Sequence, residues 1–277
     1  MEINLADEKI VELLSPFSAQ EIKERALAKR VDAFGQLAKF MQRARPDEIE
    51  ISQVERRLEP FWYGAAQARY VYDRRHRYSV PVSLEVKGVT VYGQDLTAGD
   101  QDHAFSLEAL DHCVEIMRKE MALDPLRGEE KDYSRYLSFP KRDISDLDSL
   151  RADGTVLVPP DVRSSYVVRK LVQQLMKTFQ ADKITEERID VESVILYFRP
   201  VFAFEYYWKL KEKKSVVEFD ALTGEARAES GQLKRNVVRV LENDALFDIG
   251  ADAIGTVFPG VNVAVKLGRI AARRVVR

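Results

Sequence analysis

Hydrophobic residues recur at helical spacing in two separate stretches of the chain. In residues 19–44 the apolar positions lie three to five residues apart, and Ser18 with Glu21 has the spacing of a capping box that begins a helix. Residues 162–179 repeat this pattern after two prolines. Both stretches predict amphipathic helices, whose buried positions are Ile22, Leu27, Val31, Phe34, Leu37 and Met41 in the first and Val162, Tyr166, Val167, Leu171, Leu175 and Phe179 in the second.

Strict alternation follows each of these helices and predicts strands. In residues 201–210 one face carries only large apolar side chains, from Phe202 to Leu210. This strand is expected to turn at residues 211–214 and return through 216–219, before a tight turn in which Gly224 takes a positive φ. In the first half, residues 61–72 are expected to reach a turn at 73–76 and to return through 78–84.

Two further segments read as helical. Leu107, Leu110, Val114, Met117 and Met121 form a stripe that predicts a helix at 105–122, followed by a connecting loop over 123–154. At the carboxyl end, acidic residues from 244 to 252 and basic residues from 269 to 277 recur every four positions, and Lys266 lies one turn earlier. They predict two antiparallel helices, 242–257 and 261–276, with their charges paired along one edge.

An internal repeat organises these elements. Residues 49–60 align without a gap on residues 189–200, an offset of 140 residues, and the preceding helices share the same offset. Such a repeat predicts two similar units. The expected fold class is α+β, with each unit a helix packed on an antiparallel β-meander, plus a C-terminal helical hairpin. The expected boundaries are 1–104 for the first unit, 105–158 for a helix and connecting loop, 159–236 for the second unit and 237–277 for the hairpin.

Composition narrows the functional classes. The chain has 277 residues, 45% of them hydrophobic and 32% charged, with a formal net charge of −2, so an electrostatic function has to come from local patches. The single cysteine, Cys113, excludes an intramolecular disulfide. The first residues lack the basic and apolar regions of a signal peptide, and no apolar stretch reaches the roughly 20 residues needed to span a bilayer. A cytoplasmic location is expected.

The segment V-E-F-D-A-L-T-G-E at 217–225 carries a family resemblance. An apolar strand that ends in D-x-x-T-G, with Asp220, Thr223 and Gly224, resembles the PepSY and cystatin-like group of domains. The first repeat has L-E-V-K-G at 84–88 in the corresponding place and lacks the Asp and the Thr. The resemblance implies a non-catalytic binding or regulatory module and assigns no site residue.

No linear catalytic motif is present. Phosphate-binding loops, nucleophile elbows, H-E-x-x-H and C-x-x-C are all missing. His103, His112 and Cys113 are interpreted as ordinary helix positions, because His112 and Cys113 are sequence neighbours that point to different sides. We expect no metal, no cofactor and no catalytic residue. An enzyme whose site is assembled from distant residues remains an alternative.

Basic residues cluster at the two predicted hairpin tips. Tyrosines and a tryptophan flank both clusters, so paired basic ribbons could contact nucleic acid or an acidic protein surface. The alternative is that exposed turns are often charged without any binding role. The candidate residues for an anionic partner are Arg74, Arg75 and Arg77 in the first hairpin and Lys211, Lys213 and Lys214 in the second.

The two repeats differ in side-chain volume. Phe202, Phe204, Tyr206 and Trp208 of the second repeat correspond to Trp62, Gly64, Ala66 and Ala68 of the first. Close packing forbids leaving this space empty. Either a helix docks more closely there, or these four residues of the first repeat form an apolar pocket or docking face for a partner.

The expected function is a non-enzymatic binding or assembly module for a protein or another anionic partner. Nucleic-acid binding through the paired basic tips is the alternative, followed by an unrecognised enzyme. Membrane association of the basic residues 266–277 is less expected, because the aspartates of the preceding helix would neutralise them.

Overall fold

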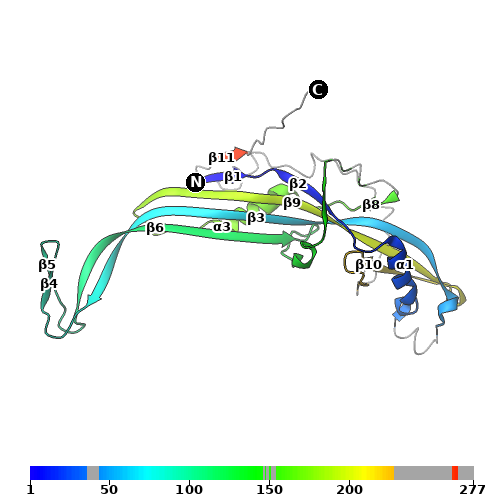
Figure 1. Ribbon diagram of the computed structural model, residues 1–277, viewed down its shortest axis with the longest axis horizontal. Coiled ribbons are helices and arrows are strands. Elements are labelled where there is room, and N and C mark those ends of the chain that lie inside the picture. Colours follow the sequence, from blue (N-terminus) through cyan, green and yellow to red (C-terminus); the bar gives the residue numbers. More distant parts are fainter. Residues whose placement is uncertain (36–43, 146, 148–149, 151–153, 228–263, 268–277) are drawn as a thin grey trace, which may run out of the picture.

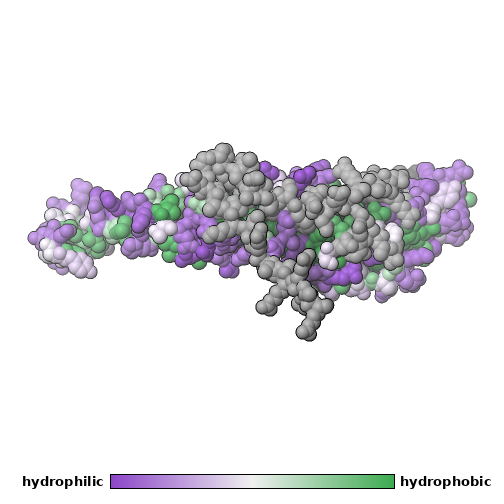
Figure 2. Space-filling view, turned by 90° about the horizontal axis from the view of Figure 1, so that it is seen from above, coloured by the Kyte–Doolittle hydropathy of each residue, from purple (hydrophilic) through white to green (hydrophobic). Residues whose placement is uncertain are grey.

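The computed structural model describes residues 1–35, 44–145, 147, 150, 154–227 and 264–267 of the chain. Strand β3 lies between two other long strands and pairs antiparallel with both. The molecule is elongated in both views (Figure 1, Figure 2), and strands β3 and β6 run out together as an arm at one end (Figure 1). The three long strands are β3 (Ile49–Pro81), β6 (Ala104–Leu123) and β9 (Lys183–Trp208).

Short strands complete this sheet. The edge of β9 that does not face β3 pairs first with β1 and β2 in parallel and then with β10 in antiparallel orientation. β7 extends the sheet from β2, β11 from β1, and β8 pairs with β3, while β4 and β5 form a separate hairpin at the tip of the arm. The bounds are β1 (Glu2–Leu5), β2 (Glu8–Leu13), β4 (Gly88–Val91), β5 (Gln94–Thr97), β7 (Lys141–Ile144), β8 (Val156–Leu157), β10 (Lys213–Asp220) and β11 (Ala264–Leu267).

Two α-helices, α1 (Ala19–Ala28) and α3 (Ser164–Leu175), pack on one face of the sheet. The even-numbered side chains of β9 from Val194 to Phe198 share a hydrophobic cluster with α3, and those from Phe202 to Trp208 share one with α1. Because side chains at every second position lie on one face, both helices cover the same side. The 3-10 turns are η1 (Asp32–Phe34), η2 (Pro46–Glu48), η3 (Ser134–Tyr136) and η5 (Lys209–Lys211).

The same device anchors both helices to the sheet. The Tyr70 hydroxyl donates to the Leu175 carbonyl of α3 at 2.7 Å, and the Tyr206 hydroxyl donates to the Ala26 carbonyl of α1 at 2.8 Å. Each bond adds a donor to a carbonyl in the last turn of a helix, where the regular i+4 amide is missing; the Ala26 carbonyl also accepts from the Lys29 amide at 3.0 Å. The capping box at Ser18 is confirmed, and the second predicted helix is confirmed as α3.

The repeat describes a local two-fold axis. Glu59 of β3 pairs directly with Arg199 of β9, and these residues are separated by the repeat offset of 140. A two-fold axis normal to the sheet through this pair exchanges residues 49–60 with 189–200. Helices α1 and α3, which cover the same face of the sheet, lie on opposite sides of this axis. The two repeats therefore build one continuous sheet around a shared centre.

The expected α+β fold class, with two helix-on-meander units and a C-terminal helical hairpin, is therefore wrong. Strands dominate the structure, and the repeated segments are neighbouring strands of one large mixed sheet. The physical reason is that a sequence repeat shows only that two segments have similar surroundings. It does not show whether each segment packs in a unit of its own or the two segments pair with each other in one sheet.

The predicted helix at 105–122 is also wrong. These residues form β6, which pairs with β3 at every position from Ala104 to Leu123. The stripe Leu107, Leu110, Val114 and Met117 fits a helix, yet Leu110 and Val114 are 49% and 60% exposed. Twenty consecutive pairings with β3 outweigh the helical preference of the many Ala, Leu, Glu and Met residues in this segment.

The first predicted turn is misplaced, whereas the second hairpin is confirmed. β3 runs straight through residues 73–76 to Pro81, so the chain reverses only between β3 and β6. β9 and β10 form the predicted hairpin, but its turn lies at residues 209–212 instead of the predicted 211–214. Gly224 has the predicted positive φ, at 71°.

Most of the C-terminal helical hairpin predicted for residues 237–277 lies outside the described residues. Within it, Ala264–Leu267 form β11, which pairs with β1, so this part is a strand instead of the predicted second helix. None of the helices in the described ranges is long and apolar enough to cross a membrane.

Candidate functional site

Two adjacent cavities lie where the segment after β6 crosses the sheet. We call them cavity A, of about 360 Å³, and cavity B, of about 410 Å³. They share Lys131, Asp132 and Tyr133. Cavity A is completed by Tyr63, Glu120, Met121, Ala122, Glu130, Ser134 and Leu137, and cavity B by Arg135, Tyr136, Arg199, Asp220, Glu225, Ala226 and Arg227.

Local hydrogen bonds fix the shared segment. The Lys131 amide donates to the Ala122 carbonyl at 3.0 Å, which ties this segment to the end of β6. The Asp132 carboxylate accepts from the Ser134 amide at 2.9 Å and from its hydroxyl at 2.6 Å, which begins the 3-10 turn η3. The Tyr133 ring stacks on Phe61 with centroids 4.4 Å apart. The wall between the two cavities is therefore held in place by packing and by backbone contacts.

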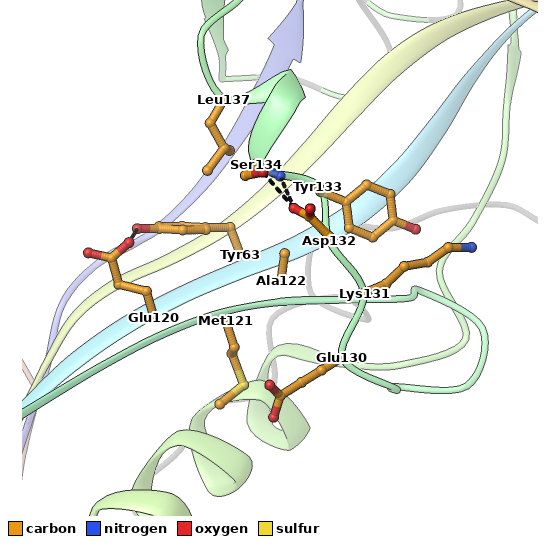
Figure 3. A pocket seen from close by; sticks show the side chains of 10 residues that line it. All are labelled: Tyr63, Glu120, Met121, Ala122, Glu130, Lys131, Asp132, Tyr133, Ser134 and Leu137. Atoms are coloured by element: carbon orange, nitrogen blue, oxygen red, sulfur yellow. Dashed lines mark hydrogen bonds between the residues drawn. The ribbon is translucent and has the colours of Figure 1, made fainter.

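Cavity A has an apolar floor and a polar rim. Tyr63 and Glu120 lie on one side of it and Lys131 on the other, with Ala122 between them (Figure 3). The Tyr63 hydroxyl donates to the Glu120 carboxylate at 3.0 Å. Burial and this bond raise the pKa of Tyr63 to about 12, so its phenol stays neutral near pH 7.

Cavity B is lined by arginines that are held in fixed positions. Arg199 donates to the Tyr136 hydroxyl at 2.8 Å and to Asp220 at 3.2 Å. Arg227 forms ion pairs with Glu59 at 2.8 Å and with Glu218 at 3.0 Å. Within the described part of the chain, Nε of Arg199 and Nη2 of Arg227 are buried and have no hydrogen-bond partner.

The Glu59 carboxylate beside cavity B stays ionised. Burial would raise the pKa of Glu59, but the neighbouring Arg227, Arg199 and Arg57 outweigh burial and lower it below its ordinary value. Arg57 itself is fully buried and forms ion pairs with Glu55, Glu59 and Glu218. The arginines of cavity B therefore extend a buried ionic network that runs across the two-fold axis.

Two further cations lie at the rim. The side chain of Lys131 is 63% exposed and lies 3.9 Å from Asp124. That of Arg135 is 60% exposed and lies 3.6 Å from Glu225, and it also donates to the Tyr136 hydroxyl at 2.7 Å. Exposed ion pairs of this kind contribute about 0–1 kcal/mol. Lys131 can therefore turn toward an anion in cavity B at little cost, whereas Arg135 would exchange its bond to Tyr136 for one to the anion.

The basic residues predicted at the hairpin tips are not brought together. The arginines lie in the arm, and Lys211, Lys213 and Lys214 lie at the β9–β10 turn at the opposite end of the molecule (Figure 1). From Ile49, opposite Trp208, to Arg75 the strand spans roughly 85 Å at 3.3 Å per residue.

Acidic neighbours also pair with most of these cations. Arg74 lies 3.2 Å from Asp111, Arg75 lies 3.9 Å from Asp182 and Arg77 lies 2.6 Å from Glu108. At the other end, Lys214 lies 3.0 Å from Glu205. A joint basic surface made by the two tips is therefore not formed.

The predicted apolar face lies beneath α3. Trp62, Ala66 and Ala68 are buried in the cluster that α3 covers, and a Cβ at Gly64 would lie 2.7 Å from Leu171. The small side chains let α3 approach the sheet closely. The helix therefore fills the space in which the sequence analysis considered an apolar pocket.

Sequence reasoning missed the residues of cavity B. Arg199 carried a signal, because it occupies the repeat position of Glu59 and so replaces an acid by a base directly before the shared proline. Tyr133, Arg135 and Tyr136 lie in the segment interpreted as a connecting loop, where no periodicity marks them.

Comparison with protein-family models, with curated proteins and with solved structures found no match to this chain. The resemblance to PepSY and cystatin-like domains stays a prediction. In the described part of the chain, no group of three or more His, Cys, Asp and Glu side chains is placed to hold a metal ion.

Proposed function

We propose that the protein is a non-catalytic binding module that holds an extended segment of a partner protein across cavities A and B. An acidic group of the partner would lie against the arginines of cavity B, and an adjacent apolar or aromatic side chain would enter cavity A. The observation that carries this proposal is the pair of adjoining cavities, one lined by three arginines and a lysine together with three carboxylates, and the other with an apolar floor.

The physical argument rests on preorganisation. Arg199 and Arg227 are 14% and 24% exposed and are already ordered by their ion pairs, so little side-chain entropy is lost when a ligand binds. Lys131 supplies positive charge that the protein holds only through an exposed ion pair, and Arg135 adds a guanidinium held at the rim by Glu225 and by the Tyr136 hydroxyl. Charge-assisted hydrogen bonds to a carboxylate are about twice as strong as neutral ones.

The other predicted functions have less support. Nucleic-acid binding by paired basic tips required the two tips to lie side by side, and they lie at opposite ends of the molecule. An enzyme without a linear motif remains an alternative prediction. Residues 266–277, the predicted membrane contact, are only partly among the described residues. The proposal keeps a cytoplasmic location, which a single cysteine at 113 fits.

The test uses fluorescence polarisation with dye-labelled peptides in which glutamate alternates with phenylalanine, compared with peptides in which glutamine replaces glutamate. We expect the acidic peptides to bind, and Arg135→Gln together with Lys131→Gln to weaken binding about tenfold or more. The matched control is Lys87→Gln, an exposed lysine of the arm, which should leave binding unchanged. Equal binding of the glutamine peptides, or no effect of the double substitution, would refute the proposal.

A further inference from the structure

The outer edge of β6 is long and open. β6 pairs with β3 over 20 residues without a register shift, and within the described ranges no strand pairs with its other edge. Only the ends of this edge are occupied, because the Ala104 carbonyl accepts from the Gly99 amide at 2.9 Å and the Ala122 carbonyl accepts from the Lys131 amide at 3.0 Å. Backbone groups alternate in direction along a strand, so the even-numbered residues between these ends present their N–H and C=O groups outward.

β6 carries charged side chains but none of the backbone features that protect an edge strand. Proline, glycine and bulges, which blunt the edge strands of natural sheets, do not occur between Ala104 and Leu123. Three large apolar side chains lie exposed on one face of β6 instead: Leu110 at 49%, Val114 at 60% and Ile116 at 57%. An exposed apolar row beside unpaired backbone groups is typical of an interface.

We propose that this edge pairs antiparallel with β6 of a second copy of the chain, about a two-fold axis at Cys113. Cys113 is the midpoint between Ala104 and Ala122, so this register brings the whole open edge of one copy against that of the other. It also places Glu108 opposite Arg118 of the second copy, and Leu110 opposite Ile116 of the second copy. Each of these pairings occurs twice by symmetry, and such cross-strand pairs stabilise a sheet.

Neighbouring registers fit less well. An axis at Val114 would place Glu108 opposite Glu120 and Leu110 opposite Arg118. Axes at Asp111 or Glu115 would set two identical carboxylates against each other. In the proposed register Asp111 faces Glu115, but each already has a cation of its own chain, Arg74 at 3.2 Å and Lys177 at 2.6 Å. The order of charged and apolar residues along β6 therefore favours the axis at Cys113.

Cys113 gives a direct readout of this register. Odd-numbered residues direct their backbone groups toward β3, so the two Cys113 residues would form a non-hydrogen-bonded pair with Cα atoms about 4.5 Å apart. That separation lies within the range of a disulfide. Mild oxidation of the dilute protein should therefore yield a covalent dimer. Moving the thiol, by Glu115→Cys in a Cys113→Ser background, should abolish the cross-link, because equivalent residues would then lie about 13 Å apart along the strand.

Analytical ultracentrifugation over a range of concentrations tests the association itself. The wild-type chain should sediment as a dimer, and Val114→Pro should raise its dissociation constant, because proline removes an outward N–H and no hydrogen bond to β3. Arg118→Glu should raise the dissociation constant about tenfold or more. Glu108→Arg combined with Arg118→Glu should lower it again, although not to the wild-type value, because the new arginine would also lie beside Arg77, the partner of Glu108 within the chain. Circular dichroism checks that each variant is folded.

Three outcomes would overturn the proposal. One is a wild-type chain that stays monomeric at every concentration. Another is a dimer that folded Val114→Pro leaves unchanged, because the interface would then lie elsewhere. The third is a cross-link that forms through residue 115 but not through residue 113, because the strands would then pair in another register.

Discussion

Substitution of Gly64 by alanine tests how closely α3 packs on the sheet. A Cβ at this position would lie 2.7 Å from Leu171 Cδ1 and 3.0 Å from Val167 Cγ1, both in side chains that are 0% exposed. Overpacking a core costs about 1–3 kcal/mol. Replacing glycine within a strand returns about 0.5–1 kcal/mol of conformational entropy. The net expectation for Gly64→Ala is a loss of about 0.5–2 kcal/mol in the free energy of unfolding.

The assay is equilibrium unfolding in urea, performed as a double-mutant cycle with Leu171→Ala. Leu171→Ala alone should cost about 2–5 kcal/mol, because it leaves a cavity beneath the helix. In that background Gly64→Ala should be nearly neutral, because the methyl group that it would strike is gone. The interaction energy should reach about 1 kcal/mol. If Gly64→Ala were as stable as the wild type, or if the two effects were additive, the close contact between α3 and β3 would be refuted.

Three further predictions concern buried polar groups. Tyr70→Phe should lower the free energy of unfolding by about 1–2 kcal/mol in urea, because the Leu175 carbonyl loses its donor. Burial raises the pKa of Tyr70 to about 12, so the stability that its neutral phenol confers should be complete below pH 10 and lost as the pH rises toward 12. The absorbance of the phenolate at alkaline pH measures this ionisation, and ionisation near pH 10 would contradict the prediction. Arg57→Met should cost about 3–5 kcal/mol in the same denaturation, because Glu59 and Glu218 lose a buried cation, and a neutral result would show that the network is not electrostatically coupled. The pKa of Glu59 is lowered, so the ionised carboxylate should stabilise the fold above pH 4.5 and lose this effect on further acidification. Glu59→Gln should therefore weaken the dependence of the free energy of unfolding on pH below 4.5, and an unchanged dependence would contradict this.

Local signals in the sequence were sufficient where an element depends on its own residues. Ser18 and Glu21 predicted the start of α1, and the alternation from Phe202 to Trp208 predicted the end of β9 and its return as β10. Gly224 predicted a turn that needs a positive φ. In each case the deciding contacts lie within a few residues of one another, so their spacing along the chain is informative.

The pattern of hydrophobic and polar residues could not predict which strands that are distant in the sequence pair with each other. Residues 105–122 satisfy a helical stripe, and only the facing strand β3 makes them β6. The sequence around Arg74, Arg75 and Arg77 is typical of a turn, but pairing with β6 continues β3 past these residues. Cavity B is formed by three segments that are distant in the sequence and come together at the two-fold axis. The spacing of residues along the chain does not show that these segments lie together. The offset of 140 was visible, but whether the repeats pair with each other is decided by three-dimensional contacts.

The central pairing of β3 with β9 constrains the order in which the chain folds. Glu59 and Arg199, at the middle of this ladder, are 140 residues apart, whereas β3 and β6 are joined by a short connection. Closing a long loop costs more entropy than closing a short one, and folds dominated by distant pairings form slowly. The arm of β3 and β6 can therefore form first during synthesis. Until β9 leaves the ribosome, the inner edge of β3 is unpaired, and at this stage the nascent chain is most exposed to aggregation and most in need of a chaperone.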